Sequence, residues 1–142
     1  MVKTRRTITA LLPGYERNRY RWRRRILANV LRAGSETGVK YATKDTFEVV
    51  VLLYLKKGKR YDIHDVDNRL KDILDALQGR FGGSKTIKSK SRLIQNDRQV
   101  CRVVIEKQKF LSHWAMMLAE GFLSVRTSAT GGRCRGARAI NF

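Results

Sequence analysis

Residues 46–55 read Thr-Phe-Glu-Val-Val-Val-Leu-Leu-Tyr-Leu, a run that is apolar at nearly every position and rich in β-branched side chains. Such side chains favour extended backbone, and a strand without polar alternation is typical of a sheet that is covered on both faces. The run therefore predicts a buried strand, which lies either in the core of the domain or in a sheet shared by a dimer.

Regular patterns on both sides of this strand predict two helices. Asp67 suits an N-cap, and apolar side chains follow it at the spacing i, i+3, i+4 and i+7: Leu70, Ile73, Leu74 and Leu77. These positions predict a helix over residues 67–77. An arginine-rich helix is predicted within residues 15–33, at least from Trp22 onward, and Gly34 is expected to end it.

Two further runs, residues 4–12 and 98–107, are rich in β-formers and predict strands. Together these elements predict an α/β (α+β) fold, a single domain whose mixed sheet of about four strands is flanked by helices. A length of 142 residues fits one domain with one modest core.

The charge balance is far from average, because 31 lysines and arginines face 12 aspartates and glutamates, a net charge of +19. Self-repulsion of this size indicates a polyanionic partner, with nucleic acid as the leading candidate. No segment reads as a basic amphipathic helix with a wide apolar face, so a membrane partner is not expected. No run approaches transmembrane length and no signal peptide is evident, so a cytoplasmic protein is expected.

The two cysteines and two histidines lack the spacing of zinc ligands, so a structural zinc site is not expected. The acids are more informative, because five of them fall within residues 62–75: Asp62, Asp65, Asp67, Asp72 and Asp75. Like charges packed together require a cation among them, which could be a divalent metal or the neighbouring arginines. Spacing alone leaves both interpretations open.

The spacing of the acids indicates how they could bind a metal together. Asp65 and Asp67 are two residues apart and point to the same side of an extended segment, while Asp67, Lys71 and Asp75 form one stripe of the predicted helix. Carboxylates are the oxygen ligands that Mg²⁺ and Mn²⁺ prefer, and a bound metal would activate water for phosphodiester hydrolysis. Lys71 could stabilise the charge that develops on the phosphate or orient the water.

The segment from Asp65 to Leu77 resembles the signature of the RusA family of Holliday junction resolvases. The family carries Asp-x-Asp-Asn, a lysine three residues later and then Asp-Ala-Leu, which match Asp65, Asp67, Asn68, Lys71, Asp75, Ala76 and Leu77. A second family element, an acid followed by one residue, Gln and Val, is similar to residues 97–100 here. A weaker match is Asn18-Arg19-Tyr20.

The resemblance implies a homodimer that uses Mg²⁺, with Mn²⁺ as a substitute, to nick four-way DNA junctions symmetrically. It implies catalytic roles for Asp65, Asp67, Lys71 and Asp97, and a metal site of Asp65, Asp67, Asp75 and Asp97. Asp75 is either a ligand or a residue that positions Lys71. No small-molecule cofactor is implied.

Three departures from the family are evident. Asn96 replaces an acid that is often paired with the catalytic one, and the connection over residues 78–95 is longer and more basic than usual. Nothing matches beyond residue 110. We therefore expect an endonuclease domain over residues 1–110 and a basic extension over residues 111–142, partly helical or disordered.

Basic residues of the first helix and of the loop after the second are expected to contact DNA phosphates: Arg17, Arg19, Arg21, Arg23, Arg24, Lys85, Lys88, Lys90 and Arg92. Tyr20 and Trp22 stand among these arginines and either stack on unpaired bases or belong to the core. The sequence thus predicts a magnesium-dependent endodeoxyribonuclease for branched DNA. The alternatives are a non-catalytic basic nucleic-acid-binding protein, or a nuclease of the same fold for other branched DNA.

Overall fold

The computed structural model describes residues 6–14, 17–55, 66–82, 91–109 and 121–127. Within them, four strands form one mixed sheet in the order β1-β4-β2-β3, flanked by two helices and a short 3-10 turn. The elements are β1 (Thr7–Leu12), α1 (Arg19–Thr37), β2 (Phe47–Leu55), α2 (Val66–Leu77), η2 (Asp97–Gln99), β3 (Val100–Lys109) and β4 (Gly121–Thr127). This confirms the predicted mixed four-stranded α+β fold.

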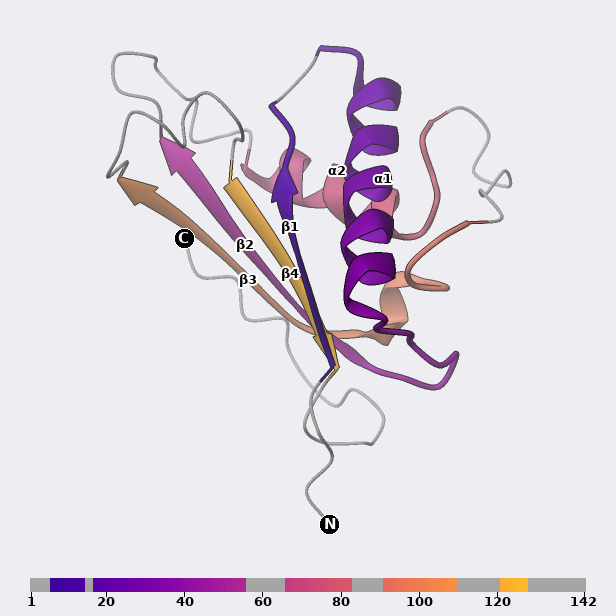
Figure 1. The fold of residues 1–142 in the computed structure, drawn as a ribbon. Coiled ribbons are helices and arrows are strands. Elements are labelled where there is room, and N and C mark those ends of the chain that lie inside the picture. Colours follow the sequence, from indigo (N-terminus) through magenta and orange to yellow (C-terminus); the bar gives the residue numbers. More distant parts are fainter. Residues whose placement is uncertain (1–5, 15–16, 56–65, 83–90, 110–120, 128–142) are drawn as a thin grey trace.

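The sheet combines two kinds of pairing. β2 and β3 are parallel, and α2 lies between them in the sequence, as a parallel pair requires a crossover connection. β4 is antiparallel to both β1 and β2 and lies between them. Figure 1 shows α1 and α2 together on one side of this sheet.

One face of the sheet forms the core with these helices. Val49 of β2 stands opposite Val125 of β4 and Val103 of β3, and all three are buried. The alternate residues Val50 and Leu52 are only partly buried. β2 is thus fully covered on one face only, where the sequence predicted cover on both.

α1 continues one turn beyond its expected end at Gly34 and stops at Gly38. A Cβ on Gly34 would lie 2.9 Å from Ile8 Cδ1, so the glycine lets β1 approach the helix closely instead of ending it. Gly38 adopts φ 69°, the left-handed conformation in which helices commonly terminate, and its N–H reaches the carbonyls of the last turn.

The position of residues 121–127 differs from the expected organisation of the C-terminal part of the chain. They were expected to belong to an extension beyond residue 110, but they form β4, an inner strand of the sheet. The reason is the alternation of the strand, which buries Gly121, Leu123 and Val125. The rest of residues 111–142 lies outside the described residues.

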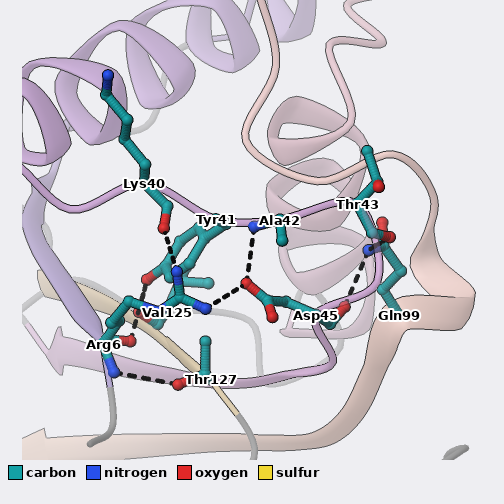
Figure 2. A network of polar contacts seen from close by, with 9 residues as sticks. All are labelled: Arg6, Lys40, Tyr41, Ala42, Thr43, Asp45, Gln99, Val125 and Thr127. Carbon is teal, nitrogen blue, oxygen red and sulfur yellow. Dashed lines mark hydrogen bonds and ion pairs between the residues drawn. The ribbon is translucent and has the colours of Figure 1, made fainter.

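A polar network closes the end of the sheet where β1 begins (Figure 2). The Arg6 guanidinium contacts Asp45 Oδ2 at 2.7 Å and donates to the Lys40 carbonyl at 2.7 Å. The Tyr41 hydroxyl donates to the Val125 carbonyl at 2.5 Å. The segment between α1 and β2 is thereby fixed to both β1 and β4.

Burial raises the pKa of Tyr41 to about 12, because the phenolate would lose its hydration. The charge of Asp45 acts in the same direction, whereas Arg6 and a backbone hydrogen bond at Ile8 oppose it. Since the folded protein holds this proton more tightly than an unfolded chain, in which the pKa has its ordinary value of 10.0, Tyr41 stabilises the fold below pH 10. That contribution is lost as the pH rises toward 12.

We expect Tyr41→Phe to lower the unfolding free energy by about 1 kcal/mol at pH 8, because one hydrogen bond is lost. The difference between wild type and variant should shrink between pH 10 and pH 12, the interval given by the two pKa values. Urea unfolding at several pH values measures it. A difference that stays constant across this interval would contradict the assigned protonation.

Candidate metal centre and nucleic-acid interface

The acidic motif lies at the start of α2. The helix begins at Val66, so Asp67 falls in its first turn and not at the predicted N-cap position before it. Asn68 and Lys71 are exposed. Asp65 and the side chain of Asp67 lie outside the described residues. The helix thus presents Lys71 one turn after Asp67 on a solvated surface.

Asp72 of α2 has a different environment, because it is only 1% exposed. Its carboxylate accepts hydrogen bonds from Arg23 Nε at 2.9 Å and from Arg19 Nη2 at 2.8 Å. Arg19 and Arg23 are four residues apart and therefore share one face of α1. Two guanidinium groups from one helix neutralise a buried carboxylate of the other, which joins α1 to α2.

Asp75 lies at the edge of the same cluster. Its Oδ2 is 3.3 Å from Arg23 Nη2, and its side chain is 21% exposed. A guanidinium at this distance competes with a divalent cation for the carboxylate. Of the two roles that the resemblance leaves for Asp75, this contact disfavours that of a metal ligand.

Asp97 begins η2, immediately before β3, and is partly exposed. Leu93 and Ile94 donate backbone hydrogen bonds to the Leu77 carbonyl, at 3.0 and 3.1 Å, and so anchor the segment before η2 to the C-terminal end of α2. The Asn96 side chain accepts from the Arg98 N–H at 2.9 Å and caps η2. The asparagine that replaces a family acid therefore has a structural role here.

Gln99 holds the Asp97 segment in place, as Figure 2 shows in part. Its side-chain N–H groups donate to the Thr43 and Asp45 carbonyls at 3.0 and 2.9 Å. Its side-chain oxygen accepts from the Gln95 N–H at 2.8 Å. The glutamine of the second motif thus links η2 to the segment that precedes β2.

Among the described side chains, no three histidine, cysteine, aspartate or glutamate groups lie close enough together to hold a metal ion. Two of the four predicted ligands, Asp65 and Asp67, are not among those side chains, so the predicted grouping stays a prediction. Within the described part of the chain, neither helix has the length and apolarity needed to cross a membrane.

The basic residues predicted to contact DNA fall into four groups. Arg17, just before α1, and Arg21 and Arg24, in its first turns, are exposed. Arg19 and Arg23 bind Asp72, and Arg23 is 9% exposed, so its guanidinium faces the protein interior and not a phosphate. Arg92 is partly buried, and the remaining residues lie outside the described part of the chain: Lys85, Lys88 and Lys90.

The two aromatic residues of α1, Trp22 and Tyr20, differ in burial. Trp22 is 0% exposed and its indole N–H donates to the Pro13 carbonyl at 2.9 Å, so it belongs to the core. Tyr20 is 48% exposed.

The pairing of Arg23 with Asp72 and the anchoring role of Gln99 were not predicted from the sequence. The spacing i, i+4 of Arg19 and Arg23, and i, i+3 of Asp72 and Asp75, signals two charged faces. It does not show that the two faces meet.

We expect Asp72→Asn to destabilise the protein by about 3–5 kcal/mol, because the Arg23 guanidinium would stay buried without its main counter-charge. The matched variant Asp75→Asn removes the same charge from a more exposed side chain and should cost about 1 kcal/mol or less. Chemical denaturation of the two variants compares them. Equal losses would contradict the central place of Asp72 in the helix interface.

Comparison with known proteins finds no family model that matches the chain and no match among curated proteins. The resemblance to the RusA family therefore stays a prediction from the motifs, and the functional assignment rests on residues and geometry.

Proposed function

We propose that the protein is a magnesium-dependent endodeoxyribonuclease of the RusA type that cuts branched DNA, with the four-way junction as its substrate. The observation that carries the proposal is the position of Asp67 and Asn68 in the first turn of α2, one turn before the exposed Lys71. A net charge of +19 supports a DNA substrate. Cytoplasmic localisation and a homodimer that nicks two strands belong to the same proposal.

The donor chemistry fits magnesium, because carboxylate oxygens are the ligands that this hard cation prefers. Asp65, Asp67 and Asp97 would hold the metal. Asp75 is assigned to positioning, since Arg23 already lies against its carboxylate. A bound metal supplies charge neutralisation at the phosphate and lowers the pKa of water.

The other residues of the site act around the scissile phosphate. Lys71 is oriented by α2 and donates hydrogen bonds to the phosphate oxygens as negative charge develops on them. Gln99 holds the Asp97 segment against the residues before β2. The oxygen of water attacks phosphorus and gives up a proton to solvent, the bond from phosphorus to the leaving sugar oxygen breaks, and that oxygen takes up a proton from solvent to become a hydroxyl.

Exposed arginines in and just before the first turns of α1 would bind DNA independently of its sequence. Arg17, Arg21 and Arg24 would contact phosphates, and such contacts make affinity fall with salt concentration. The same surface would serve a binding protein that lacks catalysis, which is the competing function. Cleavage is what distinguishes the two.

We expect paired, symmetric nicks in a labelled synthetic four-way junction when Mg²⁺ is present, and none in linear duplex. Asp67→Asn should lower the cleavage rate by at least about 100-fold, since even the partners of metal ligands contribute about 10- to 100-fold. Its junction affinity should be unchanged or higher, because one carboxylate no longer repels phosphate.

The matched control is Glu106→Gln, which removes a carboxylate from an exposed position of β3 outside the motif. It should cleave at the wild-type rate. Full activity of Asp67→Asn would refute the assigned site. Tight junction binding by the wild type without any cleavage would favour the binding-only function, with Asn96 as the first residue to restore to an acid.

A further inference from the structure

Two aromatic rings and one guanidinium form a cluster between the start of α1 and the segment that follows α2. The rings of Tyr20 and Phe81 lie edge to face, with centroids 5.8 Å apart and an interplanar angle of 76°. The Arg24 guanidinium lies 5.6 Å from the centroid of Tyr20 and 5.9 Å from that of Phe81. Because Arg24 is four residues after Tyr20, both side chains project from one face of the helix.

Tyr20 is unusual for its exposure. Among the described residues, two large hydrophobic residues are exposed: Tyr20, at 48%, and Leu11, at 45%. Phe81 supports one side of the tyrosine. Gly82 follows at φ 145°, and a Cβ on this glycine would lie 3.8 Å from Tyr20 Cδ2. The φ value favours glycine at this position, which lies beside the Tyr20 ring while Tyr20 itself stays 48% exposed.

The surroundings of this ring are cationic. Arg17, Arg21 and Arg24 are exposed on the same segment of the chain. Arginines that bind backbone phosphates, combined with an exposed aromatic face, are the arrangement by which proteins hold unpaired nucleotides. A paired base presents no free face to a protein ring, because its neighbours in the duplex already stack on it.

We propose that Tyr20, supported by Phe81 and Arg24, is a stacking site for an unpaired DNA base. The site rests on the DNA-binding part of the proposed function and gives it a means of preferring branched DNA, where bases are unpaired or weakly stacked, over continuous duplex. The ring provides the contact surface, and the arginines hold the adjoining phosphates.

The test measures binding without metal, in EDTA, by fluorescence anisotropy of a labelled single-stranded oligo(dA) and of a duplex of the same length. Tyr20→Leu should weaken binding of the single strand by at least about fivefold and change duplex binding by less than about twofold. Tyr20→Phe keeps a ring and should bind like wild type. The salt dependence should be the same in all three proteins, since no phosphate contact is removed.

Leu11→Ala is the matched control, because Leu11 is similarly exposed but lies on β1 outside the arginine-rich segment. It should leave both affinities unchanged. The inference is overturned if Tyr20→Leu weakens single-strand and duplex binding equally, or weakens neither. The experiment measures binding and not cleavage. If Tyr20→Leu has no selective effect, the nuclease proposal therefore still stands. If the protein does not cleave DNA, the binding data still test the stacking site.

Discussion

The buried carboxylate of Asp72 constrains how the two helices pack. A charge in the interior costs several kcal/mol unless it is paired, so the guanidinium of Arg23 must stay beside it. Since Arg19 and Arg23 belong to α1 and Asp72 belongs to α2, the pairing fixes which sides of the helices face each other. α1 in turn approaches β1 closely at Gly34, and the helix pair then covers one face of the sheet.

This constraint divides the acidic cluster into two parts with different roles. The carboxylate of Asp72 neutralises arginine charges of α1, and Asp75 contacts one of the same arginines, Arg23. Both acids therefore have positively charged partners within the protein. The interpretation that the acids pair with arginines thus applies to these two. The proposed metal ligands are Asp65, Asp67 and Asp97. Lys71 lies next to Asp72 in sequence but is exposed, so a single helix carries a face that packs against α1 and a face that is open to solvent.

The sequence was informative where a pattern is local. Helical spacing located α2, and the apolar runs located β1, β2 and β3 to within a few residues. It failed where the outcome depends on contacts across the fold. Gly34 was expected to end the helix because the sequence does not show that this glycine packs against Ile8. β4 was missed because its alternation is short and runs into a basic tail, yet it pairs with strands that lie at least 68 residues earlier. The ion pairs of Arg23 were missed for the same reason.

Titration with Mn²⁺, followed as the loss of the free-ion electron paramagnetic resonance signal, tests the division of the acids. Wild type, Asp67→Asn and Asp75→Asn are compared at equal concentration, with folding of each checked by circular dichroism. We expect Asp67→Asn to lose the site and Asp75→Asn to keep it. Binding that survives in Asp67→Asn, or that disappears in Asp75→Asn while the protein stays folded, would contradict this division.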